Sequence, residues 1–100
     1  MARDIVAALN RGALVCDGAM GTMLMASGVE ARCPEELNLL SPGTVRAVHE
    51  AYVAAGADVI ETNSFGGNRP KMAKAGMVEL VVEANRAAAR IAREAAGESA

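Results

Sequence analysis

The hydrophobic positions of this chain switch between helical spacing and short unbroken apolar runs. Residues 4–11 have the spacing of a short amphipathic helix, which Gly12 ends. Residues 13–16 then form a continuous apolar run that stops sharply at Asp17. An apolar run bounded by glycines is typical of a strand buried on both faces of a parallel sheet. The first element pair is therefore predicted to be a helix followed by a buried strand.

Helical spacing returns after this run, and a second apolar run follows in the middle of the chain. Residues 20–27 and 42–55 are predicted helices, the second with Ser41 as its N-cap and Pro42 in its first position. Residues 59–63 form the second predicted strand. Two more helices are expected, a short one over 70–75 capped by Asn68 and a long one over 78–96, whose predicted buried stripe is Val78, Val81, Val82, Asn85, Ala88, Ala89, Ala92 and Ala95.

The order of these elements predicts an α/β fold. Strands separated by helical crossovers form parallel βαβ units, because a parallel pair needs a long connection. Two strands do not complete a sheet, and nothing in the sequence provides a third. We therefore expect an incomplete part of a larger domain.

Composition and charge narrow the classes of partner. The chain is 52% hydrophobic, which excludes a disordered tail, and its net charge of −2 gives no reason to expect nucleic acid or an anionic membrane as partner. The apolar runs are far shorter than the roughly 20 residues of a membrane span. The N-terminal residues carry no secretory signal, so we expect a cytoplasmic protein in which Cys16 and Cys33 form no disulfide.

Both predicted strands end in a polar cluster followed by glycine. Asp17 precedes Gly18 after the first strand, and Asn63 precedes Gly66 after the second. The carboxyl ends of parallel strands form the ligand-binding edge of such folds. The segment from Asp17 to Thr22 offers a negative charge, backbone amides and a hydroxyl, which together suit a zwitterion such as an amino acid. An equally weighted alternative is that Asp17 and Thr22 only cap the following helix.

Four segments, in order and in register, resemble the homocysteine S-methyltransferase family. They are residues 17–24 (DGAMGTML), 34–39 (PEELNL), 57–66 (ADVIETNSFG) and 85–92 (NRAAARIA). The likeness runs from about residue 12 to residue 96, and it is strongest to the homocysteine-binding domain of the cobalamin-dependent members. It implies that residues 1–100 are the N-terminal part of a homocysteine-binding domain, namely the first two βα units of an incomplete (β/α)8 TIM-type barrel.

The resemblance also implies a reaction, methyl transfer to homocysteine giving methionine, and a zinc ion. In the family, three cysteine thiolates hold the zinc, which binds the homocysteine sulfur and keeps it as a thiolate. These ligands include a Cys-Cys pair that is absent here, and neither Cys16 nor Cys33 is placed as a ligand. We therefore expect the zinc ligands to lie outside this chain. The methyl donor is left open and includes methylcobalamin, a methylfolate, S-methylmethionine or a betaine.

The site residues follow from the same resemblance. The residues expected to hold the amino and carboxylate ends of homocysteine are Asp17, Gly18, Ala19, Met20 and Thr22. Asn63 and Phe65 are expected beside the sulfur, and no catalytic or metal-binding residue is assigned. The expected partners are homocysteine and the remainder of the barrel, and the 100 residues alone are expected to be inactive. We assign a surface role to His49 and expect Asn85 to hydrogen-bond a neighbouring loop.

Two alternative functions stay open. One is a different βα-barrel enzyme that uses the Asp17 loop for another small zwitterion or a phosphate. The other is a non-catalytic truncated product, or a subunit that completes its barrel with a second chain.

Overall fold

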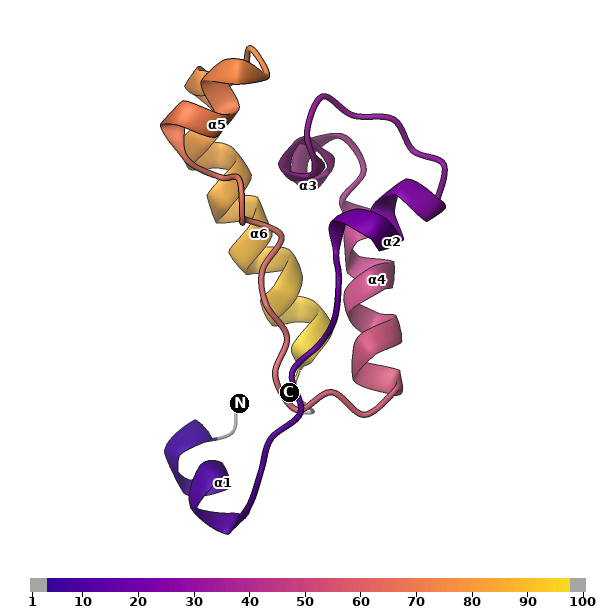
Figure 1. Cartoon of the computed structure of the whole chain (residues 1–100), viewed down its shortest axis with the longest axis vertical. Helices are drawn as coiled ribbons and strands as arrows, with labels where there is room; N and C mark the ends of the chain where they lie inside the picture. Colours follow the sequence, from indigo (N-terminus) through magenta and orange to yellow (C-terminus); the bar gives the residue numbers. More distant parts are fainter. Residues whose placement is uncertain (1–3, 98–100) are drawn as a thin grey trace.

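Six α-helices and two short 3-10 helices are the regular elements of residues 4–97, which the computed structural model describes. In chain order they are α1 (Ile5–Arg11), α2 (Gly21–Ala26), η1 (Pro34–Glu36), α3 (Leu37–Leu40), α4 (Pro42–Ala54), α5 (Arg69–Lys74), η2 (Val78–Leu80) and α6 (Val81–Ala96). Helix α6 packs mainly against α4 and α3, whereas α1 stands apart from the other helices at one end of the molecule (Figure 1).

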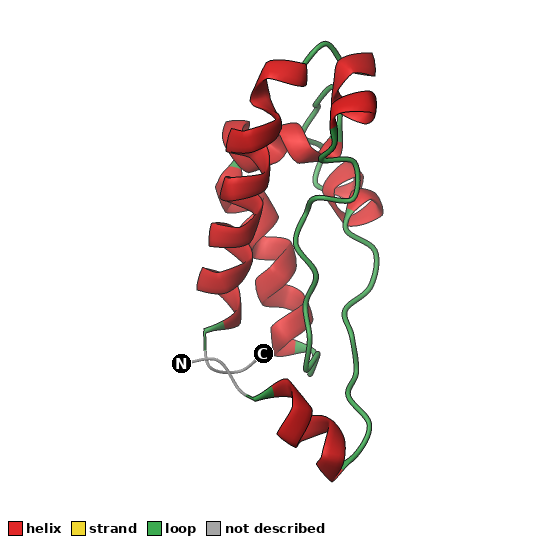
Figure 2. Cartoon of the chain, turned by 90° about the vertical axis from the view of Figure 1, so that its left-hand side faces the viewer, coloured by secondary structure: helices red, strands yellow, loops and turns green. Residues whose placement is uncertain are grey.

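The two predicted strands do not form, so the predicted α/β class, with two βα units of a barrel, is wrong for the described residues. Residues 13–17 and 58–63 run as extended segments on the same side of the helices (Figure 2). Their pairing is limited to one isolated parallel bridge between Cys16 and Val59. Around it, the Asp17 N–H donates to the Val59 carbonyl oxygen at 2.9 Å, and the Val59 N–H donates to the Val15 carbonyl oxygen at 3.2 Å.

Aspartate side chains take the place of further rungs of a β-ladder. The Val15 N–H donates to Asp58 Oδ2 at 3.0 Å, and the Glu61 N–H donates to Asp17 Oδ2 at 3.1 Å. A pair of parallel segments without outer neighbours has little to stabilise regular strands. The apolar runs were correctly located, but their hydrophobicity could not show whether backbone partners exist along both edges.

The main core lies between helices α2, α3, α4 and α6. Its buried members are Leu24, Leu37, Val45, Val48, Ala87 and Ile91, with Met20 and Tyr52 packed against them. A smaller cluster of Met72, Met77 and Ala84 anchors α5 beside α6. Alanines on α6 let its backbone approach α4 closely, while the larger side chains fill the space between the helices.

The predicted buried stripe of α6 is only partly correct. Ala88 and Ala92 are buried as expected, but Val82 is 60% exposed and Val78 is also exposed. The residues that α6 buries are Ala84, Ala87, Ala88, Ile91, Ala92 and Ala96. Apolar residues occupy more of the circumference of α6 than its neighbours cover, so periodicity alone did not identify the packed face.

Helix ends were predicted more accurately than strands. Helix α4 begins at Pro42 with Ser41 as its N-cap residue, although the Ser41 hydroxyl bonds Thr44 Oγ1 instead of a backbone amide. Asn68 caps α5 by accepting a hydrogen bond from the Lys71 N–H at 2.9 Å. These signals depend on a few adjacent residues and need no knowledge of the tertiary fold.

Within the part of the chain that the structure describes, no helix is both long enough and apolar enough to cross a lipid bilayer.

Helix α3 provides a matched test of the core. Leu37 is 2% exposed within the main cluster, whereas Leu40 on the same helix is 65% exposed. We expect Leu37→Ala to lower the free energy of unfolding by about 2–5 kcal/mol, because it leaves a cavity. Leu40→Ala should change it by less than about 0.5 kcal/mol. Urea denaturation measures both, and similar losses in the two variants would contradict this packing.

Candidate functional site

A cavity of about 460 Å³ lies where the two extended segments end, and we call it the polar cavity. This volume is within the range of small-molecule sites. Its wall is formed by Asp17, Gly18, Met20, Gly21, Cys33, Pro34, Glu35, Glu61, Thr62, Asn63, Ser64, Phe65, Gly66 and Lys71. The structure therefore brings together five residues of the predicted site, namely Asp17, Gly18, Met20, Asn63 and Phe65. The other two, Ala19 and Thr22, are exposed and lie off this wall.

Asp17 does not cap the following helix. The N-cap residue of α2 is Met20, and no side-chain hydrogen bond caps this end of the helix. The Asp17 carboxylate instead reaches the second extended segment through the Glu61 N–H, as described above. Its other oxygen, Oδ1, is buried and has no hydrogen-bond partner among the described residues. The capping interpretation is thus wrong for Asp17, and a carboxylate remains at the cavity wall.

Tyr52 clamps the loop after Asp17 onto α4. Its hydroxyl donates to the Ala19 carbonyl oxygen at 2.7 Å. Gly18 passes so close that a Cβ atom there would lie 2.9 Å from the Tyr52 hydroxyl oxygen. A side chain at position 18 would therefore push the loop away from α4, which explains why glycine follows Asp17.

Asn63 holds the cavity together through its side chain. Its amide group donates to the Pro34 carbonyl oxygen at 2.8 Å and to Asn38 Oδ1 at 3.0 Å. Asn38 in turn donates to the carbonyl oxygens of Asn63 at 2.9 Å and Ala84 at 3.1 Å. Both side chains are buried, so this pair fastens the second segment to η1, α3 and α6. The Asn63 amide nitrogen is consequently occupied by the protein itself.

The loop after Asn63 is held at two further points. Glu35, which sequence reasoning missed, is buried and accepts a hydrogen bond from the Gly66 N–H at 2.8 Å. Asn85 donates to the Gly67 carbonyl oxygen at 2.7 Å, which confirms the expected contact with a loop. Phe65 lies between these anchors and is 93% exposed. Glu35 lies in the family-like segment of residues 34–39, and this position was the signal that could have revealed it.

Acidic side chains outnumber basic ones on the wall of the polar cavity. Asp17, Glu35 and Glu61 contribute carboxylates, and Lys71 contributes the cation among the lining residues. Such a wall favours a ligand with an exposed ammonium over one that is only anionic.

The two cysteines do not form a metal site in the described residues. Both are free. Cys16 is exposed and is one of the two bridge residues, and Cys33 lies partly buried on the cavity wall. Cys16 ends the apolar run of residues 13–16 that was predicted to be a buried strand, and its exposure shows that this part of the prediction is wrong. Burial raises the pKa of the Cys33 thiol, which disfavours the thiolate that binds metals. Residues 4–97 contain no group of three or more His, Cys, Asp or Glu side chains placed to hold a metal ion.

His49 is the clearest surprise near the site. The surface role predicted for it is wrong, because its side chain is 0% exposed on the inner face of α4. Burial lowers the pKa of its imidazole, and the negative charge of Asp17 opposes this by raising it. Neither ring nitrogen has a hydrogen-bond partner in residues 4–97.

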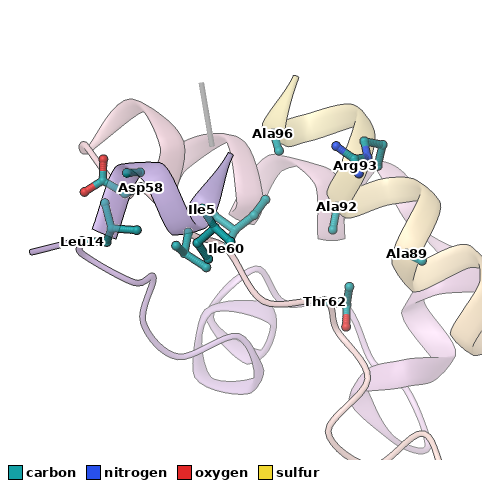
Figure 3. Close-up of a pocket in the computed structure, with 11 residues that line it drawn as sticks. Ile5, Leu14, Asp58, Ile60, Thr62, Ala89, Ala92, Arg93 and Ala96 are labelled. Carbon is teal, nitrogen blue, oxygen red and sulfur yellow. The ribbon is translucent and has the colours of Figure 1, made fainter. Parts of the chain in front are cut away.

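A second cavity, of about 380 Å³, lies between α1, the extended segments and the C-terminal part of α6 (Figure 3). Its lining is mainly apolar and consists of Ile5, Ala8, Leu14, Asp58, Val59, Ile60, Thr62, Ala89, Ala92, Arg93 and Ala96. It contains none of the predicted site residues, so the polar cavity is the better candidate for ligand binding.

Comparison with known proteins agrees with the motifs that line the polar cavity. The profile of the homocysteine S-methyltransferase family matches residues 14–100. The chain is 34% identical over 103 aligned residues to methionine synthase of Mycobacterium tuberculosis, covering 95% of this chain and 9% of that protein. It is 33% identical to methionine synthase of Mycobacterium leprae, covering 95% of this chain and 8% of the relative. The chain belongs to the homocysteine S-methyltransferase family.

Acid should weaken the turn that leads into the polar cavity. Glu36 accepts hydrogen bonds from the Arg32 backbone N–H and side chain, both at 2.8 Å, and this lowers the Glu36 pKa below its ordinary value of 4.5. A lowered folded-state pKa contributes stability above the unfolded value and loses it as pH falls through the folded value. We expect Arg32→Met to flatten the fall of unfolding free energy below about pH 4.5. Arg46→Met, at the exposed pair with Glu50, is the control. Identical pH profiles in wild type and Arg32→Met would contradict the assignment.

The close contact at Gly18 predicts a coupled pair of substitutions. We expect Gly18→Ala to destabilise the protein by about 1–3 kcal/mol, as overpacking does, because the new methyl group meets the Tyr52 hydroxyl. Tyr52→Phe removes that oxygen and should reduce the cost of Gly18→Ala, so the two effects are not additive. A double-mutant cycle measured by denaturation tests this. Additive effects would show that the two groups are not in contact. Gly43→Ala serves as a control, since a Cβ atom there meets nothing within 4 Å.

Proposed function

We propose that this chain supplies the amino-acid-binding part of an enzyme that transfers a methyl group to the sulfur of homocysteine, giving methionine. Family membership supports the reaction class. The observation that carries the site assignment is that the Asp17 carboxylate lies on the wall of the polar cavity, where the Glu61 N–H is a neutral partner that leaves its charge in place. In the proposed reaction the sulfur lone pair forms the new S–CH₃ bond as the bond between the methyl group and its donor breaks.

Homocysteine presents an ammonium, a carboxylate and a sulfur, and the polar cavity suits the first two. The ammonium pairs with Asp17, with Glu61 nearby on the same wall. The carboxylate faces Lys71 or the backbone amides that follow Gly18. Such charge-assisted hydrogen bonds are the strong ones in amino-acid recognition. Because carboxylates outnumber cations on this wall, the alternative of a phosphate ligand is disfavoured.

Zinc, which the family resemblance implies, does not fit the described residues. They lack a three-ligand group, and the Cys33 thiol has a raised pKa. We therefore propose that zinc and the methyl donor, such as methylcobalamin or a methylfolate, are bound by residues other than those described. The 100 residues by themselves are proposed to be inactive, and the cytoplasm is the proposed place of action.

Asp17→Asn tests the ammonium site in the full-length protein. Loss of a charge-assisted hydrogen bond should weaken homocysteine binding by about ten- to a hundredfold, or about 1.5–3 kcal/mol. Zinc content should stay unchanged. Asp58→Asn is a matched control, because Asp58 also accepts a backbone N–H from the other segment but lies off the polar cavity. Calorimetric titration and metal analysis give the two readouts.

The same measurements on Cys16→Ala and Cys33→Ala complete this test. Both variants should retain the zinc stoichiometry of the wild type. Homocysteine affinity unmoved by Asp17→Asn, or zinc lost with either cysteine, would refute the assignment of the site.

A further inference from the structure

Only two residues in the described part of the chain have buried side-chain nitrogen or oxygen atoms without a hydrogen-bond partner. The atoms are Oδ1 of Asp17 and both ring nitrogens of His49. Buried polar groups in native proteins are almost always paired, so such atoms need a physical explanation. It is notable that an acceptor and a donor of complementary chemistry remain unpaired in the same region.

The two side chains lie on structures that are already fastened together. His49 and Tyr52 are three residues apart on α4 and therefore point to the same side of the helix. Tyr52 bonds the Ala19 carbonyl oxygen, two residues after Asp17. The negative charge of Asp17 raises the pKa of the His49 imidazole, against the larger effect of burial, as expected for two neighbouring groups.

We propose that His49 is a positioning residue for Asp17, with a ring N–H that is linked to Oδ1 through one buried water. The Glu61 N–H already holds Oδ2, so the second bond fixes both oxygens and stops rotation of the carboxylate. The consequence for homocysteine rests on the proposed function, whereas the hydrogen bond itself does not.

A neutral imidazole suits this role better than a charged one. Neutral histidine has one N–H donor, so it can orient Asp17 without cancelling its charge. Burial favours the neutral ring because it lowers the His49 pKa. The full negative charge of Asp17 therefore remains available for a ligand ammonium in the polar cavity.

The hydrogen bond can be tested by NMR on full-length protein labelled with ¹⁵N-histidine. The His49 signal is the one that disappears in His49→Gln. We expect a ring N–H proton that is shifted downfield and protected from exchange in wild type. Asp17→Asn should move it upfield, while Asp58→Asn should leave it in place. A His49 signal that does not respond to Asp17→Asn would overturn the proposal.

Three substitutions of His49 separate positioning from packing. His49→Phe keeps an aromatic ring but has no N–H donor. His49→Asn and His49→Gln remove the ring, and each places an amide N–H close to the position that one of the two ring nitrogens has in the wild type. We expect His49→Phe to weaken homocysteine binding about tenfold, the lower end for a hydrogen bond to a charged group. One of the amide variants should restore affinity to within about threefold of wild type.

The outcomes distinguish this inference from the proposed function. Equal affinity in wild type and His49→Phe, or no rescue by either amide, would overturn the positioning role. If wild-type protein does not bind homocysteine, the proposed function fails, and the NMR experiment still decides whether His49 bonds Asp17.

Discussion

The arrangement of the polar cavity depends on how two extended segments are held side by side without a β-sheet. The single bridge between Cys16 and Val59 fixes their offset, and an aspartate on each side of it accepts a backbone N–H from the opposite segment. Asp58 does this before the bridge and Asp17 after it. Because the contacts lie on both sides, they resist sliding as well as separation. This offset places Asp17 level with Glu61, at the point where both segments reach the cavity.

Beyond the bridge, side-chain amides and a carboxylate replace the backbone ladder that a sheet would provide. The reciprocal pair of Asn38 and Asn63 ties the second segment to α3 and α6, and Glu35 secures the Gly66 N–H. These bonds are buried, where an unpaired polar group would be costly, so they fix the loop in one position. Asn63 therefore contributes to the site mainly by shaping its wall.

Sequence features that depend on a few adjacent residues predicted the structure well, whereas features that depend on distant parts of the chain did not. Caps such as Asn68 and the Ser41-Pro42 start are local, and they located helices correctly. The apolar runs were correctly located but wrongly assigned to strands, since strand formation depends on neighbours that hydrophobicity does not reveal. His49 was misplaced because helical periodicity assigns polar residues to the surface. The family motifs identified five of the fourteen residues on the cavity wall. Glu35 and Glu61 were missed as wall residues, because a motif gives no information on which side chains face inward.

The electrostatic balance of the polar cavity links these features to the proposed reaction. An amino acid must be held firmly at its zwitterionic end so that its sulfur is left free to react, and this requires charge that is oriented and not neutralised by the protein. Asp17 meets both conditions only if its partners are neutral donors. The Glu61 N–H is one such partner. In our proposal the buried neutral imidazole of His49 is the other, while Lys71 on the wall is suited to the substrate carboxylate. In our proposal the sulfur is activated as a thiolate on zinc, and the described residues contain no group of three His, Cys, Asp or Glu side chains placed to hold that ion. Under the proposed function, recognition of the amino acid and activation of its sulfur therefore fall to different parts of the protein.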